Sequence, residues 1–235
     1  GQLPLRRLEA RGCGLVELPD SLANATSMQS LRLAGNALSR VPNVVGQLSR
    51  TLSVLELNAN ALGPGSLEIL GDLKQLRSLY VSHNPQLRAL PSAWRLPNGG
   101  PTRLQVLEAV NCGFDGSLFG GPPDPTARAL PLLKAVLLSG NPRLGAAGVR
   151  ELSLAAIQSL ELVGTGLDDD GVLALNVSAA SYLVLDSNPR LTRIPPLFEH
   201  RMVRLIVLSV RFCGLAGAAA FDGVRPALVE LDSLF

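Results

Sequence analysis

The chain has 235 residues, of which 47% are hydrophobic and 4% aromatic, and its formal net charge is +2. A net charge this small does not produce the strong field expected of a protein that binds nucleic acid or a membrane surface, so neither class of partner is expected. No uninterrupted apolar run is long enough to cross a bilayer, and we expect no membrane segment in these residues. A core rich in aliphatic side chains and poor in rings suits thin stacked layers better than a globular interior.

Residues 28–38, with the sequence MQSLRLAGNAL, show the pattern of the whole chain. Leu31 and Leu33 alternate as in a short strand, and Asn36 follows at a turn. The pattern returns about every 24 residues, which is typical of a solenoid. Each copy, called a rung here, fits the frame L-x-x-L-x-L-x-x-N-x-L, with its first, fourth, sixth and eleventh positions pointing inward. First positions lie at residues 5, 28, 52, 76, 104, 133, 157, 180, 205 and 228.

Because several residues of the frame recur in each of these rungs, the sequence resembles the leucine-rich-repeat family over essentially the whole chain. The resemblance implies an α/β solenoid, a right-handed horseshoe with a parallel sheet on its concave face. One rung cannot bury its own leucines, so stacking of neighbours is required on physical grounds as well. We expect residues 1–235 to form a single repeat domain without a signal peptide. The ends lack caps, which predicts a fragment of a longer chain or a part of a complex.

The segments between rungs, called returns, are of two predicted kinds. A proline stands directly after the rung at Pro19, Pro42, Pro91 and Pro195, and it blocks a long helix in favour of an extended or 3₁₀ return. The returns that begin at Gly65, Gly148 and Gly171 have helical apolar spacing and resemble those of ribonuclease-inhibitor-like repeats. The expected convex side therefore mixes 3₁₀, extended and α-helical segments.

Two longer segments, residues 95–102 and 115–131, are dense in Gly and Pro. This composition disfavours regular structure, and we expect two neighbouring loops that protrude from the middle of the solenoid. Tolerated insertion and ligand binding are both open as explanations of these loops. The acidic run Asp168 to Asp170 precedes a predicted helical return, where negative charge stabilises the helix N-terminus.

Few residues have the chemistry for catalysis or metal binding. Cys13, Cys112 and Cys213 occupy ninth positions, where the family accepts Cys in place of Asn, and they lie four rungs apart, too far for a disulfide or a shared metal. His83 and His200 are isolated, which supports neither a zinc site nor a catalytic triad. We expect no cofactor, no metal and no enzymatic activity. The missing terminal cysteine clusters favour a reducing, intracellular compartment, with an extracellular location as the alternative.

In this family, function usually resides on the outward positions of the strands, which are the second, third, fifth, seventh and eighth of each rung. A soluble monomer rarely leaves a contiguous apolar patch uncovered, and aromatic and Arg side chains anchor interfaces. We therefore predict a partner-binding face over rungs four to nine, although strand propensity alone also favours β-branched residues there. Its residues are Tyr80, Val106, Val110, Leu137, Val163, Tyr182, Val184, Ile206, Arg211 and Phe212.

Basic residues gather on the first two rungs and suggest a second kind of contact, with an acidic partner or a phosphate. They are Arg6, Arg7, Arg11 and Arg32, with Glu9 and Glu56 interleaved among them. The sequence thus predicts a non-catalytic scaffold or recognition module that binds a protein partner on its concave face. The alternatives are the substrate-recognition arm of a larger enzyme, of kinase or ubiquitin-ligase type, and an extracellular ligand-recognition domain.

Overall fold

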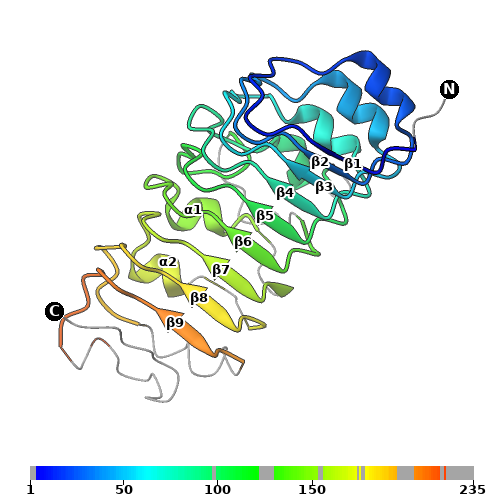
Figure 1. The fold of residues 1–235 in the computed structure, drawn as a ribbon. Coiled ribbons are helices and arrows are strands. Elements are labelled where there is room, and N and C mark those ends of the chain that lie inside the picture. The colour runs from blue at the N-terminus through cyan, green and yellow to red at the C-terminus, as the bar shows by residue number, and fades with distance from the viewer. Residues whose placement is uncertain are drawn as a thin grey trace.

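Nine short strands form one open parallel sheet in the computed structural model, which describes residues 4–96, 99–121, 130–152, 156–173, 175, 178–194, 204–217 and 220. The strands follow each other in chain order and lie side by side along one side of the solenoid, with short helices on the other side (Figure 1). They are Arg7–Glu9 (β1), Ser30–Arg32 (β2), Val54–Glu56 (β3), Ser78–Tyr80 (β4), Val106–Glu108 (β5), Ala135–Leu137 (β6), Ser159–Glu161 (β7), Tyr182–Val184 (β8) and Val207–Ser209 (β9). The predicted α/β solenoid with a parallel sheet is confirmed.

The inward positions of the rungs build the core. In each strand the fourth position pairs with the fourth position of the next strand, as Leu8 does with Leu31 and Leu31 with Leu55. Leu31 and Leu55 are fully buried, whereas the residues on either side of them in the strand are partly exposed. Because every rung adds the same layer, the buried residues form one cluster that runs from Leu18 to Val210.

The returns contain short helices behind the sheet: the 3₁₀ helices Asp20–Asn24 (η1), Asn43–Leu48 (η2), Glu68–Asp72 (η3) and Ser92–Arg95 (η4), and the α-helices Gly145–Val149 (α1) and Asp169–Leu173 (α2). As predicted, Pro19, Pro42 and Pro91 each directly precede a 3₁₀ helix; Pro195 lies outside the described residues. Among the described residues, no helix has the length and apolar character that crossing a bilayer requires.

Two of the three predicted helical returns contain a short α-helix, although each helix begins before the predicted start and α1 ends at Val149. Gly148 lies in α1, and Gly171 lies in α2, where its backbone N–H donates to Asp168 Oδ1 at 2.8 Å. The return that begins at Gly65 is instead the 3₁₀ helix η3. Its buried leucines at 67, 70 and 73 repeat every third residue, which matches the period of a 3₁₀ helix more closely than that of an α-helix.

The prediction of two protruding loops is wrong for Gly100, Pro101 and residues 117–119, which are buried, whereas Leu96 and Asp115 are exposed. Leu118 and Phe119 are fully buried, because their apolar side chains complete the core where this return has no helix. Behind the sheet, Arg95 Nη2 contacts buried Glu151 at 2.6 Å, and the Leu118 backbone N–H donates to Glu151 Oε2 at 2.7 Å. Gly and Pro thus exclude regular structure here without excluding burial. Residues 97–98 and 122–129 lie outside the described residues.

In most rungs the side chain at the ninth position ties the rung to the one before it, whereas Thr165 of rung seven donates to Leu162 of its own rung. Asn84 Oδ1 accepts hydrogen bonds from the backbone N–H groups of Asn60 and Leu62, and Asn84 Nδ2 donates to the carbonyl oxygens of Leu57 and Val81. The same donation to the sixth-position carbonyls of two rungs is made by Asn36, Asn60, Asn141 and Asn188. These bonds satisfy backbone groups that are buried and have no strand partner.

Replacing Asn84 with Ala tests this role. The substitution leaves several buried backbone groups unpaired, so we expect the free energy of unfolding to fall by about 3 kcal/mol. Exposed Asn43 on η2 is the matched control, and its replacement with Ala is expected to change stability by no more than about 0.5 kcal/mol. Urea denaturation followed by circular dichroism measures both. Equal losses in the two variants would contradict a special role for the ninth position.

Candidate functional site

The outward positions of the strands form one surface, which we call the open sheet face. Parallel pairing in register sets residues of the same rung position beside each other on neighbouring strands. The fifth positions make a row that crosses all nine strands, here called the fifth-position row. It consists of Glu9, Arg32, Glu56, Tyr80, Glu108, Leu137, Glu161, Val184 and Ser209.

Apolar side chains of this face differ in exposure along the solenoid. Tyr182, Ile206 and Phe212 are 50%, 63% and 80% exposed. The others of the predicted set are only partly exposed, namely Tyr80, Val106, Val110, Leu137, Val163 and Val184. Ile206 precedes β9 and Phe212 follows it, so these two lie at opposite ends of one strand and do not join in a single patch. The partly exposed apolar residues lie over β4 to β8, where Glu108 of β5 and Glu161 of β7 stand between them.

Phe212 is exposed in an unusual backbone conformation. The eighth position of every rung from one to nine has a positive φ, and Phe212 has a φ of 55°. This conformation costs a residue with a side chain roughly 1–2 kcal/mol, which is why Gly occupies several of these positions. Neither burial nor local backbone preference favours an aromatic side chain at this position.

Polar groups at the C-terminal end of the face bind each other. Asp186 Oδ1 accepts hydrogen bonds from the backbone N–H of Arg211 at 2.9 Å and from Ser209 Oγ at 2.7 Å. Asp186 Oδ2 lies 3.1 Å from Arg211 Nε. The predicted interface residue Arg211 is therefore held by an ion pair of its own chain, with about half of its side chain exposed.

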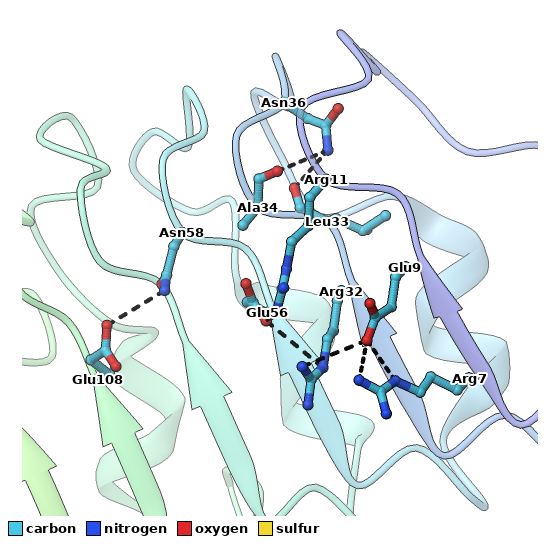
Figure 2. Close-up of polar contacts among 10 residues, drawn as sticks. All are labelled: Arg7, Glu9, Arg11, Arg32, Leu33, Ala34, Asn36, Glu56, Asn58 and Glu108. Atoms are coloured by element: carbon cyan, nitrogen blue, oxygen red, sulfur yellow. Dashed lines mark hydrogen bonds and ion pairs between the residues drawn. The ribbon is translucent and has the colours of Figure 1, made fainter.

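The arginines of the first rungs are paired with glutamates in the same way (Figure 2). Arg32 lies between two glutamates, with its Nη1 3.6 Å from Glu9 Oε1 and its Nε 3.9 Å from Glu56 Oε2. Arg11 Nη2 is 2.5 Å from Glu56 Oε2. Arg7 forms an ion pair with Glu9, and its guanidinium lowers the pKa of that carboxyl. Among the described residues only Arg6 of the predicted basic set has no ion pair. The cluster thus neutralises much of its own charge, a pairing that rung positions alone did not reveal.

The three cysteines are free thiols at ninth positions. Cys112 Sγ lies 3.2 Å from the carbonyl oxygen of Val81, and Cys213 Sγ lies 3.3 Å from that of Leu185, so both take over one bond that Asn makes elsewhere. Burial raises the pKa of Cys112 to about 12 and also raises the pKa of Cys213. A neutral thiol is a poor nucleophile and a poor metal ligand.

Histidine does not form a reactive site in the described part of the chain. His83 Nδ1 lies 3.3 Å from Asn111 Nδ2, and both residues occupy eighth positions of neighbouring rungs. His200 lies outside the described residues. Within the described ranges, no group of three or more His, Cys, Asp or Glu side chains is arranged to hold a metal ion.

Comparison with known proteins agrees with this architecture. No family model matches the chain. Tsukushi of Mus musculus is 31% identical over 153 residues, which cover 61% of this chain and 40% of Tsukushi, so the chain spans well under two thirds of that relative. The chain has the leucine-rich-repeat fold, as its rungs, its parallel sheet and the solved structures described next show.

Solved structures share the fold at low sequence identity. A leucine-rich-repeat protein of Leptospira interrogans has a TM-score of 0.66 and 20% identity, covering 91% of this chain and 51% of its own. The repeat domain of the type III effector XopL has a TM-score of 0.67 and 22% identity, and the match covers 95% of this chain and 75% of the XopL domain. TLR13, solved in complex with the RNA ssRNA13, has a TM-score of 0.69 and 20% identity, covering 95% and 32%.

The three thiols should differ in reactivity. At pH 8 we expect exposed Cys13 to react with an aromatic disulfide reagent first, partly buried Cys213 more slowly, and Cys112 only after unfolding in guanidinium. The raised pKa keeps the buried Cys112 thiol protonated at pH 8. Its contribution to the free energy of unfolding is lost only as pH rises from about 9 toward about 12, where the unfolded thiol ionises before the folded one. Mass spectrometry of the labelled peptides gives the order. Fast native labelling of Cys112 would contradict its burial.

Proposed function

We propose that this chain is a non-catalytic recognition module that binds a protein partner on the open sheet face over rungs four to nine. The supporting observation is the apolar surface over β5 to β8, where Leu137, Val163 and Val184 point away from the core. The helices of the described returns all lie on the other side of the sheet, so no described return covers these side chains (Figure 1).

An open face spread over adjacent strands suits a protein segment better than a small ligand, which favours an enclosed pocket. A specific protein interface buries about 800 Å² on each partner, and several neighbouring strands are needed to supply that area. Burial of partly exposed side chains such as Leu137 stabilises the complex by roughly 25 cal/mol for each Å² of apolar surface removed from water. The sheet is also preorganised for binding, because the ninth-position bonds already hold the strands in place. Binding therefore does not cost the entropy of ordering them.

The location and the wider assembly remain predictions. The free thiol of exposed Cys13 supports a reducing, intracellular compartment. One neighbour in fold is the ectodomain of a plant membrane receptor kinase, which keeps the alternative of extracellular recognition open. The third hypothesis is a substrate-recognition arm of a larger enzyme.

Charged substitutions on the open sheet face test the proposal. Leu137→Asp and Val184→Asp place a carboxylate in the apolar part of the face, and we expect each to reduce capture of the native partner at least tenfold, because an unpaired charge is costly to bury. The matched control is Leu173→Asp on α2, behind the sheet, where Leu173 is 41% exposed. Affinity capture of the full-length protein with quantitative mass spectrometry is the measurement. Capture that survives both face variants, with the fold intact by circular dichroism, would overturn the proposal.

A second candidate is binding of an acidic partner by Arg6, Arg7, Arg11 and Arg32, which form one basic cluster at the N-terminal end. The pairing of Arg7, Arg11 and Arg32 with glutamates weakens this candidate, since paired charges attract a further anion less strongly. The solved complex of TLR13 contains RNA, and this concerns TLR13 alone.

Removing the paired glutamates should unmask this cluster. We expect the Glu9→Gln, Glu56→Gln double variant to elute from a heparin column at higher salt than the wild type, because the arginines lose their partners. The Glu17→Gln, Glu68→Gln double variant carries the same change in net charge at exposed positions and controls for it. Equal elution of the two double variants would show that the glutamates do not mask the arginines.

A further inference from the structure

Two carboxylates of the open sheet face have no cationic partner among the described residues. Glu9, Glu56 and Asp186 are each paired with an arginine. Within the same described ranges, Glu108 accepts hydrogen bonds only from uncharged groups, Ser82 Oγ at 2.7 Å and Asn58 Nδ2 at 3.4 Å.

The carboxylate of Glu161 has neither an ion pair nor a hydrogen bond with any described residue. Glu108 and Glu161 therefore differ from the other acidic residues of this face. Neither carboxylate has an arginine or lysine partner among the described residues, so a cationic ligand has access to both.

These two carboxylates stand at a regular spacing on an apolar background. From β4 to β8 the fifth-position row alternates strand by strand between apolar and acidic side chains, in the order Tyr80, Glu108, Leu137, Glu161 and Val184. Neighbouring strands are about 4.8 Å apart, so the backbones that carry the two glutamates are about 9.6 Å apart. Among the described residues no group of three or more His, Cys, Asp or Glu side chains that could hold a metal ion includes them.

We propose that this part of the row binds an extended basic segment of a partner protein, in which two Lys or Arg residues are separated by two other residues. The basic side chains contact Glu108 and Glu161, and the residues between them pack on Leu137. This inference rests on the proposed function, because it names the chemistry of a partner on the same face.

The spacing selects the conformation of the segment. A polyproline II helix advances about 3.1 Å per residue with three residues per turn, so every third side chain points the same way at intervals of about 9.3 Å. In a β-strand, side chains on one face recur about every 6.7 Å, which does not match the carboxylates. In an α-helix, residues seven apart recur at about 10.5 Å, a poorer match than the polyproline II segment.

Synthetic peptides binding to the whole chain test the inference. The probes are fluorescent nine-residue peptides of Pro and Leu that carry two lysines separated by one, two or three residues, and a helical peptide with lysines seven apart. Fluorescence anisotropy gives the dissociation constants. We expect the peptide with two intervening residues to bind at least about threefold more tightly than each of the others, in line with one additional ion pair.

Substitution of the two glutamates locates the contact. Glu108→Gln and Glu161→Gln should each weaken the best peptide about threefold and together about tenfold, while Glu68→Gln on η3 behind the sheet should not change its affinity. Glutamine retains an oxygen that accepts from Ser82, so the fold is preserved. Any one of three results would overturn the inference. The affinity does not depend on lysine spacing, neither glutamate substitution changes it, or the helical peptide binds most tightly.

The outcomes separate this inference from the proposed function. If Leu137→Asp abolishes partner capture while the glutamate substitutions have no effect on capture or on peptide affinity, the open sheet face is the interface and the basic segment is wrong. If neither Leu137→Asp nor the glutamate substitutions affect capture, the face is not the interface and both proposals fail.

Discussion

The ninth-position side chain is the constraint on which the rest of the structure depends. Each inward turn leaves buried backbone groups that no strand can pair, and one asparagine amide satisfies such groups in two rungs at once, as Asn84 does. The asparagine amide reaches the carbonyls of both rungs only when the rungs stack in register. It therefore stabilises the in-register parallel sheet. Where Cys112 replaces Asn, its thiol has one proton to donate, with Val81 O at 3.2 Å and Val110 O at 3.7 Å, and Asn141 of the next rung accepts from the Cys112 backbone N–H.

Register in turn determines how the surface is organised. Because equal rung positions lie beside each other, a residue on one strand acts on its counterparts one and two strands away. This is how Arg32 comes to lie between Glu9 and Glu56. Glu108 also accepts from Asn58, which occupies the seventh position two rungs earlier. The open sheet face is thereby divided into a neutralised basic end, a central apolar and acidic part, and an ion-paired C-terminal end.

The fold was readable from the sequence because its main determinant, a leucine frame with Asn, Thr or Cys at the ninth position, recurs in rungs one to nine. The surface was less readable, since strand register fixes neighbours but not which charges pair. Rung positions placed Arg7, Arg11 and Arg32 on one surface correctly, yet their glutamate partners became clear only from side-chain geometry. Burial of Leu118 and Phe119 was missed because Gly and Pro around them signal irregular backbone, which was equated with exposure.

The central claim is that the open sheet face over rungs four to nine is the recognition surface. The most direct measurement is methyl NMR of the isotopically labelled chain during titration with its captured partner. Shifts or broadening at Leu137, Val163 and Val184, with Leu173 on α2 unchanged, are the predicted result. Perturbation confined to Leu173 and other residues behind the sheet would contradict the account.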